Sequence, residues 1–178
     1  MLAGVSFGTF GLAWSGLGLA AIQLPEKSSA LTERRLVAKS GSTGAAVPPP
    51  WVAALIADIQ HYLAGEKIDF SAVQVDLRNL EPFRRQLYVA LRAIGFGATV
   101  TYGELARRIG APEPEGARDV GAAMGANPMP IVIPCHRVLA AGGKLGGFSA
   151  PGGTVTKQRL LALEGVHFDR GAPRLPGL

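Results

Sequence analysis

The only cysteine of the chain, Cys135, is preceded by Pro134 and followed directly by His136 in the segment I-V-I-P-C-H-R-V at residues 131–138. The thiolate is the nucleophilic form of cysteine, and a neighbouring imidazole lowers the thiol pKa. Consecutive side chains of a strand point to opposite faces, so the pair can cooperate only where the chain turns or a water bridges it. Pro134 favours such a turn because it has no amide hydrogen. The pair predicts nucleophilic chemistry; the alternative is a buried cysteine that acts as a small hydrophobic side chain.

Two short helices before this pair would have to help position it. Thr101 is expected to cap a helix over 101–110, because Glu104 three residues later completes a capping box, and Gly110 ends that helix. After a loop with two prolines, a second helix runs from residue 115 or 116 to about Gly125, and its side chains are unusually small. This order predicts a helix-turn-helix unit, although many helical hairpins of this kind bind no DNA.

The N-terminal half predicts a small sheet and further helices. Residues 5–7 and 12–14 are expected to form paired strands, and Gly16 and Gly18 to supply a turn before 19–24, which together make a β-meander. The spacing of apolar residues predicts an amphipathic helix over 51–63. Another helix is expected over 80–93, with Glu81 and Pro82 in its first turn.

These elements predict an α/β fold in two parts. The first is a small N-terminal antiparallel sheet with a helix, and the second is a mainly helical C-terminal domain that carries the helix-turn-helix and the cysteine. The expected division is an N-terminal domain at 1–78 with a flexible, proline-ended segment at 40–50, a C-terminal domain at 79–168 and a tail at 169–178.

The composition indicates a globular protein with an anionic partner. At 178 residues and 48% hydrophobic content the chain can bury a core, and its net charge of +5 and pI near 9.8 favour an anionic partner such as nucleic acid. A single cysteine excludes an internal disulfide and suits a reducing cytosol. The apolar first two dozen residues could form a secretory signal, but no Lys or Arg precedes Lys27, so a cytoplasmic protein is expected. One cysteine and three histidines offer no zinc-ligand spacing, and we expect no metal site.

From residue 98 to 165 the chain resembles the catalytic domain of the O6-alkylguanine-DNA alkyltransferases, also called methylated-DNA–protein-cysteine methyltransferases. The resemblance lies in four ordered motifs: T-V-T-Y-G-E-L-A at 99–106, A-R-D-V-G-A-A-M at 117–124, N-P-M-P-I-V-I-P-C-H-R-V at 127–138 and L-L-A-L-E-G at 160–165. It implies irreversible, stoichiometric transfer of an alkyl group from O6-alkylguanine in DNA to the cysteine, without a cofactor. O4-alkylthymine is implied as a secondary substrate.

The resemblance also implies roles for individual residues. Cys135 would be the alkyl acceptor, activated through a water by His136, which Glu164 would orient in a relay with the logic of a catalytic triad. Asn127 would brace the loop around the cysteine. Tyr102 would contact the phosphate of the rotated nucleotide and donate to guanine N3.

DNA recognition is implied for the small-residue helix. Arg118 matches the arginine that enters the base stack, and Ala122 and Gly125 belong to the small residues that let the helix approach the minor groove. Asp119 departs from the small residue expected there and would weaken phosphate binding unless it is neutralised. The implied substrate pocket consists of Met124, Val138, Phe148 and Ser149, the last two from a lid at 146–150.

The implied partner is double-stranded DNA with alkylated bases, bound by a monomer, with no role for a membrane. The main alternative is a non-catalytic alkyltransferase-like sensor of DNA lesions, a group that lacks the reactive cysteine. A cysteine hydrolase would also use a cysteine and a histidine, but it must regenerate its thiol.

Overall fold

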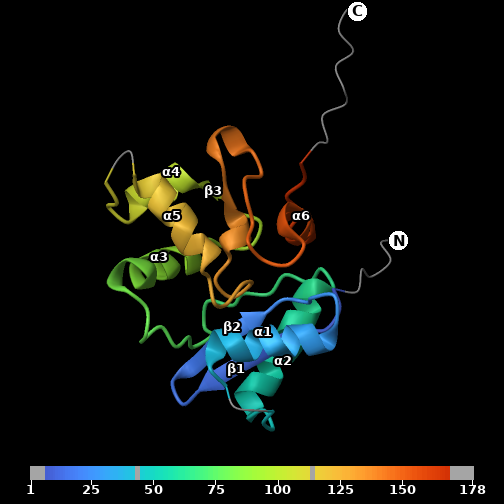
Figure 1. Cartoon of the computed structure of the whole chain (residues 1–178). Helices are drawn as coiled ribbons and strands as arrows, with labels where there is room; N and C mark the ends of the chain where they lie inside the picture. Colours follow the sequence, from blue (N-terminus) through green and yellow to red (C-terminus); the bar gives the residue numbers. More distant parts are fainter. Residues whose placement is uncertain (1–6, 43–44, 113–114, 169–178) are drawn as a thin grey trace, which may run out of the picture.

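The computed structural model describes residues 7–42, 45–112 and 115–168, and Figure 1 shows their arrangement. The N-terminal part contains the antiparallel pair β1 (Gly11–Ser15) and β2 (Gly18–Gln23), followed by α1 (Ser29–Ser40) and α2 (Pro50–Leu63). In Figure 1 these elements form the lower half of the molecule, and the helices α3 to α5 lie above them. The fold is mixed α/β, as predicted.

The first strand of the predicted β-meander, at residues 5–7, falls mostly outside the described residues. Phe7 lies outside any strand, and Val5 and Ser6 lie outside the described residues. β2 has additional partners from later in the chain. The Leu19 amide donates to the Gln74 carbonyl at 2.9 Å, and the Leu19 carbonyl accepts from the Asp76 amide at 2.7 Å. Local alternation of side chains could not reveal this long-range pairing.

The turn between the two strands depends on Gly18, as predicted. Its φ is +135°, and a Cβ atom at this position would lie 2.5 Å from the carbonyl oxygen of Gln74. A glycine is therefore required both by the backbone conformation and by the close approach of the neighbouring chain.

Helix α1 was not predicted. Ser28 caps its N-terminus by accepting from the Leu31 amide at 3.2 Å, and Gly41 ends it in the left-handed region with φ +67°. The predicted flexible segment at 40–50 lies between α1 and α2 and overlaps each helix by one residue. Ser40 is the last residue of α1, Pro50 is the first of α2, and residues 43–44 lie outside the described residues.

The two helices predicted over 51–63 and 80–93 are present as α2 and α3. α2 begins at Pro50 and packs its apolar face inward, and α3 (Pro82–Arg92) has Pro82 in its first turn. Proline suits these positions because the first-turn amides have no helical acceptor. The buried residues of α2 are Val52, Leu55, Ile59 and Tyr62.

The C-terminal part contains the predicted helix-turn-helix. Its elements are β3 (Val100–Thr101), α4 (Tyr102–Arg108), α5 (Gly116–Gly125), the 3-10 turn η1 (Cys135–Arg137), β4 (Val138–Leu139), the 3-10 turn η2 (Ala141–Gly143) and α6 (Gly153–Leu163). The capping box of α4 is present: Glu104 N donates to Thr101 Oγ1 at 3.2 Å, and Thr101 N donates to Glu104 Oε2 at 2.7 Å. β3 pairs with β4 in parallel, which places the start of α4 beside the end of η1.

One hydrophobic core joins the two parts. Leu19 and Tyr62 from the N-terminal part pack in the same cluster as Leu105, Met129 and Leu160. The Ile22 amide of β2 also donates to the Pro128 carbonyl at 2.8 Å, so the sheet reaches the loop that precedes Cys135. The division at residues 78 and 79 stays a prediction. Within the described ranges, no helix has the length and apolar character needed to cross a membrane.

Candidate active site

Cys135 occupies the first position of the turn η1, where the chain does turn as Pro134 predicted. The Cys135 amide donates to the Ile133 carbonyl at 2.8 Å, and the side chain is buried. The loop before it contains Ile131 in the left-handed region, with φ +77°. A β-branched residue in this region is strained, and such strain persists only where the surrounding structure enforces it.

Asn127 braces this loop from α5's C-terminal side. Its Nδ2 donates to the Ile133 carbonyl at 2.8 Å and to Cys135 Sγ at 3.1 Å, while its Oδ1 accepts from the Met129 amide at 3.0 Å. Both ends of the amide are thus engaged, which fixes its orientation. A donor aimed at the sulfur stabilises the thiolate relative to the thiol.

The protonation of Cys135 reflects two opposing effects. Burial raises the pKa of the thiol, and the hydrogen bond from Asn127 and the positive charge of Lys157 act against it. The thiol is therefore the resting form at neutral pH, and its reaction requires a base that can take the proton.

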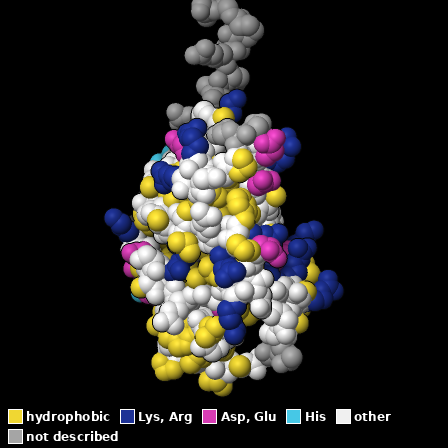
Figure 2. All heavy atoms as spheres, turned by 90° about the vertical axis from the view of Figure 1, so that its left-hand side faces the viewer, with side chains coloured by type: hydrophobic (Ala, Val, Ile, Leu, Met, Phe, Trp, Pro, Cys, Tyr) yellow, Lys and Arg dark blue, Asp and Glu magenta, His cyan; other side chains and the backbone are white. Residues whose placement is uncertain are grey.

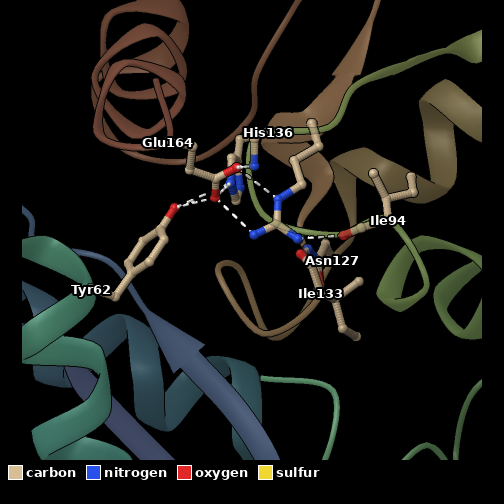
Figure 3. A network of polar contacts seen from close by, with 8 residues as sticks. Tyr62, Ile94, Asn127, Ile133, His136 and Glu164 are labelled. Atoms are coloured by element: carbon tan, nitrogen blue, oxygen red, sulfur yellow. Dashed lines mark hydrogen bonds and ion pairs between the residues drawn. The ribbon is translucent and has the colours of Figure 1, made fainter. Parts of the chain in front are cut away.

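His136 and Glu164 form the core of a buried polar network (Figure 3). His136 Nε2 lies 2.9 Å from Glu164 Oε1, and Glu164 is the residue directly after α6. Arg137 donates to both oxygens of the same carboxylate, at 2.9 Å from Nε and 2.8 Å from Nη2, and the Gly97 amide donates to Oε2 at 3.1 Å. Arg137 also donates through Nη1 to the Ile94 carbonyl.

These donors set the charge state of the network. Burial alone would raise the pKa of Glu164, but hydrogen bonds from His136 and Arg137 outweigh it and hold the pKa well below its usual range. The carboxylate is ionised, so His136 Nε2 carries the proton that it donates to Glu164. Burial lowers the pKa of His136 despite Glu164, and the imidazole is neutral with an unprotonated Nδ1. Nδ1 is buried and has no hydrogen-bond partner among the described residues, which leaves it available as a base.

Cys135 lines two adjoining cavities. One, of about 290 Å³, is bounded by Tyr102, Gly121, Met124, Gly125, Gly147, Phe148 and Ser149. The other, of about 330 Å³, includes Asn127, Met124 and Ser149 together with Gln23 and Lys39 of the N-terminal part. The predicted pocket residues therefore meet at the sulfur, with one exception: Val138 is fully buried in β4 and lines neither cavity.

The Tyr102 ring lies near Gly121 of α5 and near Gly146. An ideal Cβ at Gly146 would lie 3.4 Å from this ring, and one at Gly121 would lie 4.0 Å from it. Burial raises the pKa of Tyr102, so its hydroxyl is a protonated donor at neutral pH. Lys157 Nζ lies 5.9 Å from the centre of the Tyr102 ring.

α5 presents the predicted DNA-facing residues to solvent. Arg118, Ala122 and Gly125 follow the i, i+4, i+7 spacing of one helix face, and all three are exposed, as is Asp119. Figure 2 views the molecule from the side on which α3 to α5 lie in Figure 1, and Lys and Arg side chains recur across this face. A face of this kind suits a polyanion.

The geometry agrees with three comparisons with known proteins. The family model described as "6-O-methylguanine DNA methyltransferase, DNA binding domain" matches residues 82–166. A methylated-DNA–protein-cysteine methyltransferase of Mycolicibacterium paratuberculosis is 42% identical over 156 residues, which cover 86% of this chain and 90% of the relative. The chain belongs to the methylated-DNA–protein-cysteine methyltransferase family.

Two further relatives extend this result. A crystal structure of Mycobacterium tuberculosis OGT in complex with DNA matches with a TM-score of 0.69 and 36% identity, over 89% of this chain and 87% of that one. A protein of Thermus thermophilus named DNA base-flipping protein is 42% identical over 108 residues, which cover 61% of this chain and 69% of the relative. Known methyltransferase structures thus share the fold of this family member.

Sequence reasoning missed two residues of the site. Tyr62 reaches the His136–Glu164 pair from α2, and Lys157 is fully buried and donates to the Val138 carbonyl at 2.5 Å. Tyr62 looked like an ordinary position of the amphipathic helix predicted over 51–63, and no amphipathic helix was predicted around Lys157. A buried tyrosine hydroxyl or lysine needs a hydrogen-bond partner, but its burial is not visible in the sequence. Among the described residues, no three His, Cys, Asp or Glu side chains cluster in a way that could hold a metal ion.

Proposed function

We propose that this family member repairs DNA by accepting an alkyl group from O6-alkylguanine onto Cys135 in a single, irreversible reaction. The observation that carries the proposal is the position of Cys135: it lines a 290 Å³ cavity, accepts a hydrogen bond from Asn127, and is followed in the turn by His136, which pairs with Glu164. A nucleophile, a base and a group that orients the base are the parts that nucleophilic catalysis requires.

The chemical step follows from these parts. The thiol proton passes through a water to His136 Nδ1, and the thiolate attacks the alkyl carbon in line with the bond to guanine O6. The carbon–sulfur bond forms as the carbon–oxygen bond breaks, and the electron pair returns to the guanine. The Tyr102 hydroxyl, as a hydrogen-bond donor near N3, stabilises the departing guanine, which takes up one proton in place of the one that the thiol gave to His136. The product is a thioether, which water does not cleave, so each molecule reacts once.

Access to the alkylated base requires that the nucleotide leave the helix. Unstacking costs a few kcal/mol and is least costly at a damaged pair. We propose that α5 enters the minor groove with Ala122 and Gly125 against the sugar edges, and that Arg118 fills the space left by the extruded base. Asp119 on the same helix weakens phosphate contacts and moderates affinity.

The substrate pocket of the proposal comprises Met124, Phe148 and Ser149, with Val138 supporting it from the core. O4-alkylthymine is a secondary substrate because it presents a similar alkylated exocyclic oxygen. The protein acts as a monomer in the cytoplasm and uses no cofactor.

A lesion sensor without catalysis is the second candidate function, because one relative is named DNA base-flipping protein. The presence of Cys135 next to the His136–Glu164 pair favours catalysis. The test is a duplex with one O6-methylguanine, incubated with the protein and then digested to nucleosides. Repair converts one equivalent of O6-methylguanine to guanine per protein molecule, and Cys135→Ala converts none while still binding the duplex in an anisotropy assay. Lesion-selective binding by the wild-type protein without conversion would establish the sensor instead.

A further inference from the structure

A tyrosine from the N-terminal part completes the polar network of the active site. Tyr62 lies on α2, 74 residues before His136 and 102 residues before Glu164. Its hydroxyl donates to Glu164 Oε1 at 2.8 Å and lies 3.2 Å from His136 Nε2 (Figure 3). The side chain is fully buried.

The ring of Tyr62 is held on two sides. It packs edge-on against Phe70, with ring centres 5.6 Å apart, and against Phe96, with ring centres 6.2 Å apart. The hydroxyl has therefore little freedom to leave the carboxylate. Burial and the neighbouring Glu164 raise the pKa of Tyr62 well above its usual value, so the hydroxyl stays a donor across the physiological pH range.

We propose that Tyr62 is a positioning residue for alkyl transfer: its hydroxyl holds Glu164 Oε1 against His136 Nε2 and takes up part of the negative charge of the carboxylate. This inference rests on the proposed function. It has two consequences. The ring of His136 is fixed with Nδ1 turned away from the carboxylate, and the N-terminal part supplies a component of the relay that the C-terminal motifs do not contain.

The expected effect on protonation has a definite sign. Among the described residues, the charges of Glu164, Arg137 and Lys157 act on His136, and the Tyr62 hydroxyl contacts its ring, while Cys135 precedes it in the chain. Removing the Tyr62 hydroxyl leaves the carboxylate with more uncompensated charge, which stabilises the protonated imidazole. The pKa of His136 then rises, and the histidine must lose its proton at a higher pH before it can serve as a base.

The experiment compares Tyr62→Phe with Tyr88→Phe. Tyr88 is a matched control because it is also fully buried and donates one hydrogen bond, to the Ala123 carbonyl at 2.7 Å, away from the network. The rate of alkylation of Cys135 by iodoacetamide is measured from pH 5 to pH 10, together with thermal unfolding. This probe needs no DNA, so the result is independent of whether methylated DNA is the substrate.

We expect Tyr62→Phe to move the acidic limb of the profile upward by about one pH unit, which lowers the rate roughly tenfold at pH values below the limb. Tyr88→Phe should lose stability but keep the wild-type limb. The inference is overturned if Tyr62→Phe keeps the wild-type limb, or moves it to lower pH, whatever its loss of stability.

A second variant covers the case in which Tyr62→Phe does not fold. Replacing Tyr62 by 3-fluorotyrosine keeps the ring and the hydroxyl and makes the hydroxyl a stronger donor. The acidic limb should then move to lower pH. An unchanged limb in this variant also overturns the inference, since a tyrosine that only fills space has no reason to respond to the strength of its hydroxyl as a donor.

Discussion

Glu164→Gln should be one of the most damaging single substitutions in the protein, because Glu164 accepts five hydrogen bonds in the buried network. Its two oxygens receive hydrogen bonds from the Tyr62 hydroxyl, His136, two nitrogens of Arg137 and the Gly97 amide. A glutamine has one acceptor oxygen, and its NH₂ group would face donors. The charge of Arg137 would remain buried without its counter-ion.

Breaking a buried ion pair by removing one partner costs about 3 to 5 kcal/mol. For a chain of 178 residues, we expect the melting temperature to fall by roughly 10 °C, at about 2 to 4 °C per kcal/mol. Alkyl transfer should also slow, because His136 loses the group that orients it. Calorimetry and urea unfolding measure the stability, and the double variant with Arg137→Met measures the coupling.

The pH dependence gives an independent check. The folded-state pKa of Glu164 is depressed, so its ionisation stabilises the protein above the ordinary glutamate pKa of about 4.3, and this contribution is lost as the pH falls toward the folded-state pKa. The stability gap between wild type and Glu164→Gln should thus be largest above about pH 5 and narrow in acid. A loss below about 1 kcal/mol, or losses that simply add when Arg137→Met is combined with it, would refute the account of the network.

Three further predictions concern Asn127, Gly18 and Lys157. Asn127→Ala removes the donor to the Cys135 sulfur, so the thiol pKa should rise further and iodoacetamide should react about tenfold more slowly at pH 7. Gly18→Ala should lower the free energy of unfolding by about 2 to 4 kcal/mol in urea titrations, whereas Gly16→Ala, which meets no atom within 4 Å, should change it little. Burial lowers the pKa of Lys157 to about 8, so wild-type stability should rise between about pH 8 and pH 10.5, and Lys157→Met should flatten that rise.

Local signals in the sequence predicted most of the helices. Thr101 and Glu104 defined the start of α4 because a capping box is encoded within four residues, and Pro82 marked the first turn of α3. Helix α1 was not predicted, because its polar composition lacks a clear apolar stripe. Its N-cap Ser28 and its C-cap Gly41 are residue types typical of helix ends, but they were not enough to indicate the helix.

The site could be predicted only where its residues lie in motifs. Cys135 and His136 are adjacent, and the resemblance to a known family supplied Glu164 and Asn127. Tyr62 could not be found in this way, since its role depends on the packing of α2 against His136 and Glu164, which lie 74 and 102 residues later in the chain. Burial and long-range contact decide such roles, and neither has a local sequence pattern.

The most direct test of the central claim is intact-protein mass spectrometry after reaction with a duplex that contains O6-methylguanine. The account predicts that the wild-type protein gains one methyl group in place of the thiol hydrogen, that the gain saturates at one equivalent, that peptide mapping places it on Cys135, and that Cys135→Ala shows none. A protein whose mass stays unchanged while it binds the lesion, or one that carries the methyl group on another residue, would contradict the account.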